Sequence, residues 1–380
     1  MQKSEILADY NEKSRNINID IIKVLTVFFV ISAHFLWHNN FYFTTISCPR
    51  MFVMATMRTF FMMTIGIFIL TTGYLMHKKE FSKKYYTNIK RIIFPYILIS
   101  IITFVAKICL VKYGIFEPDT IINHFYNFVD FRLNEYAWYV DMYLGLYLLI
   151  PFINKMLSNK MQDTILVITL LFLTALPSIL EYPTLILSQW THIWIITYYM
   201  IGAYIAKYDI KISLKLLIFL YITFFTIFAT MNNINTQGQT WHIPGNGDAY
   251  GGYQNVITGV LFFLIILKTD FNKLPDKVKI FISNTAKLTL GIFLSSYIFD
   301  KIFYHYLNMY ITNTTATLEW IVIIVPAVFV CSILFAKFID IIYKYIDRKF
   351  LNFDKNWWVL LRSHRVSIFK QIKIPLTRLS

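Results

Sequence analysis

Long apolar runs, separated by short polar segments, fill the chain almost from end to end. An apolar run of about 18 residues or more is long enough to cross a bilayer as a helix. The runs that meet this description are 19–37, 52–76, 92–112, 136–157, 163–180, 190–206, 213–231, 252–268, 285–306 and 317–343. The pattern therefore predicts an all-α fold, a polytopic membrane bundle of about ten transmembrane helices.

The composition supports a membrane protein and argues against an ordinary soluble domain. Of the 380 residues, 57% are hydrophobic and 18% are aromatic, and the mean hydropathy is +0.54. Soluble domains rarely reach these values. The first 18 residues are polar, and no small-residue cleavage site follows the first apolar run, so we expect that run to remain as a helix.

The net charge of +15 would suit a nucleic-acid partner, but its distribution indicates membrane topology instead. Most Lys and Arg residues fall in alternate connections, such as 77–91, 207–215 and 268–279. This is the bias of cytoplasmic segments in a protein of the cell inner membrane. We therefore expect cytoplasmic N- and C-termini and no nucleic-acid partner, and the sequence leaves the oligomeric state open.

Three parts follow from these patterns. Residues 1–18 form an expected cytoplasmic segment, residues 19–345 the transmembrane domain, and residues 346–380 a basic cytoplasmic tail. Trp357 and Trp358 in the tail are typical of a segment that lies on the membrane surface. The three cysteines are scattered, which predicts neither a disulfide framework nor a structural zinc site.

The first apolar run carries charged groups that hydrocarbon disfavours. On a helix, Asp20, Lys23, His34 and His38 fall within one stripe about 60° wide. Each ionisable group at the bilayer centre costs about 2.5–3.5 kcal/mol on insertion scales, so such a stripe is expected to face the bundle interior. His34 is the candidate general base, because imidazole exchanges a proton near neutral pH.

Other interpretations of the stripe stay open. Asp20 and Lys23 also suit an ion pair at a helix end, and His34 also suits a structural hydrogen bond. The i, i+4 spacing of His34 and His38 suits a metal, but no third and fourth ligand are evident in sequence, so no metal is expected.

The stripe resembles the first helix of the acyltransferase 3 family of integral membrane acyltransferases. That family's usual signature is an Arg, ten intervening residues and a His; this chain has Lys23, ten residues and His34, preceded by Asp20. Further segments resemble the family in the same order: "FILTTGYLM" (68–76), "KRIIFPYI" (90–97), "WYVDMYLGLYLLIPF" (138–152), "YYMIGAYIA" (198–206) and "LTLGIFLSSY" (288–297). The resemblance covers about 15–345.

Two positions depart from the family pattern. Lys23 replaces the signature Arg and keeps its charge without the planar fork that binds phosphate or carboxylate bidentately. Ser296 stands where many relatives have a His in the late helix.

The resemblance implies transfer of an acyl group, most often acetyl from acetyl-CoA, to a hydroxyl of a cell-envelope or exported polysaccharide. His34 is then the base that takes the hydroxyl proton, or a nucleophile that carries the acyl group. Lys23, Lys90 and Arg91 are candidates for binding the CoA phosphates, and Lys90 and Arg91 also fit topology alone.

Two further charges are candidates for catalysis. Arg58 lies in the outer part of the second run and could polarise the acyl oxygen, or be a rim charge. Asp141 follows Trp138 in the fourth run and could orient His34 or pair with Arg58.

The connection 232–251 is expected on the outer side of the membrane. Trp241 and Tyr250 in this connection, together with Trp138, are candidates for contacting a glycan or lipid-linked glycan acceptor. The alternative is a flexible outer loop. The competing function is a transporter or exporter of a lipid-linked sugar, since polar stripes also line transport paths.

Overall fold

The computed structural model describes residues 16–179 and 188–347, so the expected tail at 346–380 lies almost wholly outside the described residues. The described part is helical and contains no strand, apart from an isolated bridge between Ile46 and Gln237. Its α-helices are α2 (Ile17–His38), α3 (Pro49–Phe61), α4 (Thr64–Met76), α5 (Lys83–Thr87), α6 (Lys90–Leu110), α7 (Ile121–Val129), α8 (Trp138–Asn154), α9 (Lys160–Thr174), α10 (Trp194–Lys207), α11 (Leu214–Thr236), α12 (Tyr253–Lys268), α13 (Asp276–Ala286), α14 (Thr289–Tyr310), α15 (Thr314–Thr317) and α16 (Ile321–Ile346). Short 3₁₀ helices are η1 (Phe41–Phe43), η2 (Val111–Tyr113), η3 (Leu176–Ser178), η4 (Ser188–Ile193), η5 (Pro244–Asn246) and η6 (Leu318–Trp320).

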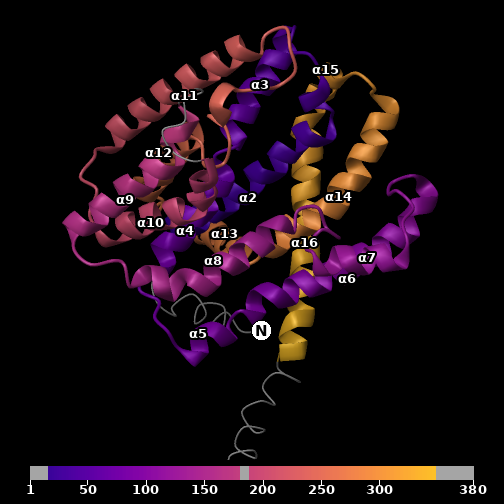
Figure 1. Ribbon diagram of the computed structural model, residues 1–380. Coiled ribbons are helices and arrows are strands. Elements are labelled where there is room, and N and C mark those ends of the chain that lie inside the picture. Colours follow the sequence, from indigo (N-terminus) through magenta and orange to yellow (C-terminus); the bar gives the residue numbers. More distant parts are fainter. Residues whose placement is uncertain (1–15, 180–187, 348–380) are drawn as a thin grey trace, which may run out of the picture.

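Helix α2 runs through the middle of the bundle (Figure 1). It packs against α3, α4, α12, α13, α14 and α16. Its start is fixed by Asn18, whose amide donates hydrogen bonds to three carbonyls at the end of α12. These bonds satisfy acceptors that a helix C-terminus leaves open. We call the two ends of the bundle the Ile17 end and the His38 end, after the bounds of α2.

The number of membrane spans differs from the expectation of ten. Within the described residues, six helices are long and apolar enough to cross a membrane, or seven if the bent pair α13–α14 counts as one span. The expected spans at 136–157, 190–206 and 252–268 are helices α8, α10 and α12, of 17, 14 and 16 residues. They are shorter than the roughly 20 residues that a bilayer core requires. An all-helical, multi-pass membrane protein is confirmed, whereas the count of ten and the orientation are not.

Helices α4 and α10 approach each other backbone to backbone. A Cβ atom on Gly73 would collide with the carbonyl oxygen of Tyr199, and one on Gly202 would collide with that of Leu70. Membrane helices associate without a hydrophobic driving force, so close packing through small residues stabilises them. These two glycines therefore hold α4, which lines the cavity described below, against the centre of the bundle.

We predict that Gly73→Ala lowers the stability of the purified protein by about 1–3 kcal/mol, because the added methyl forces two backbones apart. Gly145→Ala is the matched control, since nothing lies within 4 Å of a Cβ at that position on α8. Alanine favours a helix over glycine by about 1 kcal/mol, so the control should keep or raise stability. Thermal unfolding in detergent measures both variants; equal melting temperatures would contradict the close contact.

Candidate active site

The imidazole of His34 lies against the side chain of Asp300. His34 Nδ1 is 3.3 Å from Asp300 Oδ2, and the carboxylate of Asp300 is fully buried while His34 keeps 18% of its side-chain surface exposed. Asp300 lies in α14, which packs along α2. Asp300 Oδ2 has two partners, Tyr136 and His34, and the His34 contact is at ion-pair distance without hydrogen-bond geometry.

Tyr136 supplies the second partner from the segment that leads into α8. Its hydroxyl donates to Asp300 Oδ2 at 2.7 Å. Its ring stacks on the His34 ring, with centroids 3.8 Å apart. Asn134 fixes this segment, because its side chain accepts from the Tyr136 backbone and donates to the Leu294 carbonyl.

His38 extends the network by one member. Its Nε2 lies 2.8 Å from the Tyr136 hydroxyl. Since that hydroxyl gives its only proton to Asp300, its oxygen accepts from the Nε2–H of His38. His38, Tyr136, Asp300 and His34 thus form one continuous chain of polar contacts.

This arrangement orients His34 for proton transfer. Because Nδ1 faces the carboxylate of Asp300, we infer that neutral His34 carries its proton on Nδ1 and leaves the Nε2 lone pair free. No hydrogen bond to Nε2 is present among the described residues. Asp300 therefore occupies the orienting position that we expected for Asp141.

A cavity of about 310 Å³ connects Lys23 with the surroundings of His34. Its walls come from α2, α4, α6, α8 and α14. Phe293 lines it, and the Phe293 ring is 6.1 Å from the His34 ring. The hydroxyl groups in its wall are those of Thr71, Thr72, Thr289, Tyr139 and Tyr143.

The two other expected phosphate ligands lie beside this cavity and do not line it. Lys90 Nζ forms an ion pair with Asp347 at 2.7 Å. Arg91 is exposed, and the next residue, Ile92, lines the cavity.

The sequence interpretation did not identify a basic pocket at the Ile17 end. This pocket has a volume of about 580 Å³ and is lined by His77, Lys78, Lys79, Glu80, Phe81, Pro151, Asn154 and Lys155. Met76 of the cavity wall and His77 of the pocket wall are adjacent in the sequence, at the end of α4. The Lys155 ammonium lies 4.5 Å from the centre of the Phe81 ring.

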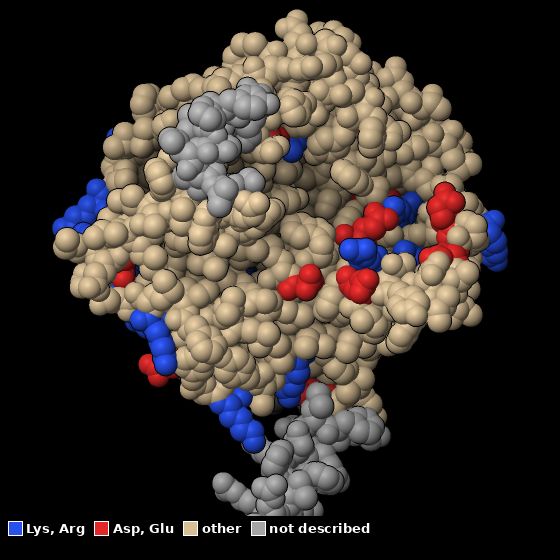
Figure 2. Space-filling view, viewed as in Figure 1, with Lys and Arg blue, Asp and Glu red and all other residues tan. Residues whose placement is uncertain are grey.

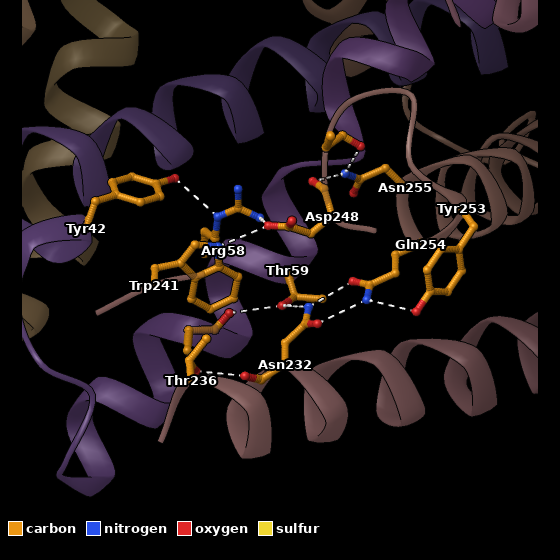
Figure 3. Close-up of polar contacts among 12 residues, drawn as sticks. Tyr42, Arg58, Thr59, Asn232, Thr236, Trp241, Asp248, Tyr253, Gln254 and Asn255 are labelled. Carbon is orange, nitrogen blue, oxygen red and sulfur yellow. Dashed lines mark hydrogen bonds and ion pairs between the residues drawn. The ribbon is translucent and has the colours of Figure 1, made fainter. Parts of the chain in front are cut away.

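Arg58 belongs to a separate cluster, which Figure 3 shows between α3 and the loop after α11. Its guanidinium pairs with Asp248 at 2.5 Å and donates to the Tyr42 hydroxyl. The Trp241 ring covers it at 4.6 Å, and the indole N–H donates to Asp248. Arg58 is thus neutralised and fixed by the loop, and it does not contact His34 in the part of the chain that the structure describes.

The same part of the chain shows no ion pair or hydrogen bond that involves Asp141 and either His34 or Arg58. Asp141 is exposed in the first turn of α8. The two pairings expected for it are taken by Asp300 and Asp248. A catalytic role for Arg58 or Asp141 stays a prediction that this geometry does not support.

Two of the three aromatic residues expected to bind an acceptor lie together. The rings of Trp138 and Tyr250 stack with centroids 5.6 Å apart, and 37% of Trp138 is exposed. Burial raises the pKa of the Tyr250 hydroxyl to about 12, so this group stays a protonated donor at physiological pH. Trp138 is two residues from Tyr136, which places this pair beside the His34 network.

Comparison with known protein families matches residues 16–336 to the family described as "Acyltransferase domain", Acyl_transf_3. The chain belongs to this acyltransferase family. No curated protein and no solved structure matches it. The matched region contains α2, the cavity and the whole His34 network, so the acyltransferase has its candidate active site inside the family domain.

The sequence interpretation of this acyltransferase missed Asp300 and Tyr136 as partners of His34. Asp300 carried a signal, because an acidic residue inside an apolar helix requires a partner. Tyr136 carried none, since the chain has 26 tyrosines. Among the described residues, no group of three or more His, Cys, Asp or Glu side chains is arranged to hold a metal ion.

We predict that Tyr136→Phe lowers the acyl-transfer rate about tenfold, because Asp300 loses a hydrogen bond worth about 1.5 kcal/mol. His38→Ala should add little in the Tyr136→Phe background, since His38 reaches Asp300 only through that hydroxyl. Tyr304→Phe is the control: its ring stacks on His38, but its hydroxyl has no hydrogen-bond partner within the described residues. If the loss of rate in the double variant Tyr136→Phe/His38→Ala equals the sum of the two single losses in free energy, the two residues do not share one network.

Proposed function

We propose that this membrane acyltransferase is an O-acetyltransferase of the cell inner membrane. In this proposal it moves an acetyl group from cytosolic acetyl-CoA to a hydroxyl of a cell-envelope polysaccharide. The observation that carries the proposal is the cavity between Lys23 and the rings around His34. A partly hydroxyl-lined cavity that leads from a cation to the rings beside the proposed general base suits a long anionic thioester.

The donor is proposed to enter at the Ile17 end. His34 follows Lys23 by eleven positions, which is about 16–17 Å along a helix and suits an extended pantetheine arm. We assign the CoA phosphates to the basic pocket of His77, Lys78, Lys79 and Lys155, because it lies at the same end of α4 as Met76 of the cavity wall. Lysines bind phosphate as point charges. Lys90 is the weaker candidate, because Asp347 already neutralises it.

The orientation in the membrane follows from the same charges. Lys and Arg side chains lie along the lower edge of the face in Figure 2, where Figure 1 places α5 and the end of α16. Basic residues favour the cytoplasmic side, which supports a cytoplasmic Ile17 end. The acceptor is then proposed to approach from the His38 end.

In the proposed reaction, His34 Nε2 takes the proton of the acceptor hydroxyl while the oxygen attacks the thioester carbonyl carbon. A carbon–oxygen bond forms, and the tetrahedral intermediate then loses its carbon–sulfur bond. The departing sulfur receives the proton from the His34 imidazolium and leaves as the CoA thiol. Asp300 stabilises the imidazolium between these steps.

The proposed acceptor platform is the stacked pair Trp138 and Tyr250. The partly exposed ring of Trp138 suits the apolar face of a sugar ring, and the more buried Tyr250 supports that ring by stacking on it. Trp241 suits this role less well, because its ring and its N–H are already engaged by Arg58 and Asp248.

We predict opposite kinetic defects for two variants of the stripe. His34→Ala should lower kcat by about 10²-fold or more, because the general base is lost. Lys23→Ala should mainly raise the KM for acetyl-CoA, because it removes a contact that the ground state and the transition state share. Purified protein with acetyl-CoA and envelope glycan provides the assay. His305→Ala, a histidine of α14 outside the network, is the control; a wild-type rate for His34→Ala would reject the mechanism.

A second kinetic prediction concerns the acceptor. Trp138→Ala should raise the KM for the glycan while the KM for acetyl-CoA stays unchanged, since the ring lies on the acceptor side of His34. Trp190→Ala is the matched control, because this tryptophan is similarly exposed, at 48%, and lies in η4. If Trp138→Ala leaves the glycan KM at the control value, the platform does not bind the acceptor.

A further inference from the structure

Helix α7 lies on the surface of the bundle and presents an apolar face outward. Ile121, Ile122, Phe125, Tyr126 and Val129 are each at least 55% exposed. A short helix of nine residues with this pattern is typical of a segment that lies in the membrane interface. Figure 1 shows α7 beside the outer half of α6, at the right of the view.

An apolar pocket of about 250 Å³ lies between α6 and α7. Two buried polar side chains, Ser100 of α6 and His124 of α7, lie in its otherwise apolar wall. His124 is 4% exposed, and its Nδ1 has no hydrogen-bond partner among the described residues. The nearest carboxylate oxygen, on Asp119, is 3.7 Å from that nitrogen, beyond hydrogen-bond distance. Since this nitrogen is itself buried, the surface that faces the pocket is almost wholly apolar, and the pocket suits a hydrocarbon chain.

The same face of α6 leads from the pocket to a cation. Ser100, Phe104 and Lys107 follow one another at i, i+4 and i+7, so they share one stripe of the helix. Lys107 lies about 10 Å from Ser100 along the axis, toward the His38 end. It is half-buried over the rings of Phe116 and Tyr297, and no described carboxylate is within ion-pair distance.

A second ammonium lies over the same ring. Lys301 Nζ is 5.4 Å from the Tyr297 centroid, compared with 5.9 Å for Lys107 Nζ. Lys301 is paired with Glu135 at 3.0 Å, whereas Lys107 has no ion pair within the described residues. Figure 2 shows that charged side chains gather at this part of the face, over α6 and α7, while most of the face carries none.

We propose that α6, α7 and α14 form a binding site for a lipid with a phosphate head group. Its chain occupies the pocket beside Ser100 and His124, and its phosphate lies at Lys107 and Lys301. The order of the two parts along α6 matches a lipid of one leaflet, with the chain toward the membrane centre and the head group toward the His38 end. A free phosphate would leave the pocket empty, and an uncharged lipid would leave Lys107 without an anion. The site goes beyond the proposed acyl transfer and does not depend on it.

Native mass spectrometry of the full-length protein in detergent tests this site directly. The probes are dioleoylphosphatidic acid, dioleoylglycerol and inorganic phosphate. Phosphatidic acid should bind at least about fivefold more tightly than dioleoylglycerol, as expected for one phosphate–lysine interaction. Lys107→Gln should remove this preference, and Ser100→Leu, which fills the pocket, should weaken both lipids. Inorganic phosphate in excess should not displace the lipid.

Lys112→Gln is the matched control, because Lys112 also lies over an aromatic ring, that of Tyr113, at the same end of the helix. It should bind like the wild type, and the melting temperature of each variant shows whether it is folded. Equal binding of the two lipids would reduce the site to a nonspecific apolar pocket. Displacement by inorganic phosphate, or an unchanged preference in folded Lys107→Gln, would also overturn the proposal.

Discussion

The buried carboxylate of Asp300 is the constraint around which the active site is built. It has no exposed surface, and it accepts from Tyr136 while it faces His34. A buried charge is retained only when it is paired and hydrogen-bonded. These contacts tie together α2, α14 and the start of α8, so the position of each helix is coupled to the orientation of one imidazole. Removing Asp300 would therefore disturb both the packing of three helices and the chemistry.

The network also explains why the two ends of the bundle differ. Toward the Ile17 end lie Lys23, in the cavity wall, and a separate basic pocket with several lysines. Toward the His38 end, the stacked rings of Trp138 and Tyr250 lie beside Tyr136. His34 lies between the two, stacked on Tyr136 and 6.1 Å from the ring of Phe293 in the cavity wall. Arg58 acts on the acceptor side only through the loop. Its ion pair with Asp248 stabilises the loop that carries Trp241 and Tyr250.

The sequence predicted the helical class and the stripe of α2 because both depend on local periodicity. It could not predict which residue meets His34, since the contacts with Asp300 and Tyr136 join segments far apart in the chain. The same limit explains Arg58 and Lys90, whose partners Asp248 and Asp347 lie nearly 200 residues or more away. The count of ten spans is not confirmed, because apolar composition does not distinguish a full span from a short helix such as α10.

The central claim is that Asp300 holds the proton of His34 on Nδ1 and leaves Nε2 free to accept the proton of the acceptor hydroxyl. Nitrogen-15 NMR of histidine-labelled protein in lipid nanodiscs measures this directly, with the His34 signals assigned by their loss in His34→Ala. The account predicts that neutral His34 has a protonated Nδ1 and an unprotonated Nε2, and that Asp300→Ala abolishes this preference. A protonated Nε2 in the neutral wild-type imidazole would contradict the account.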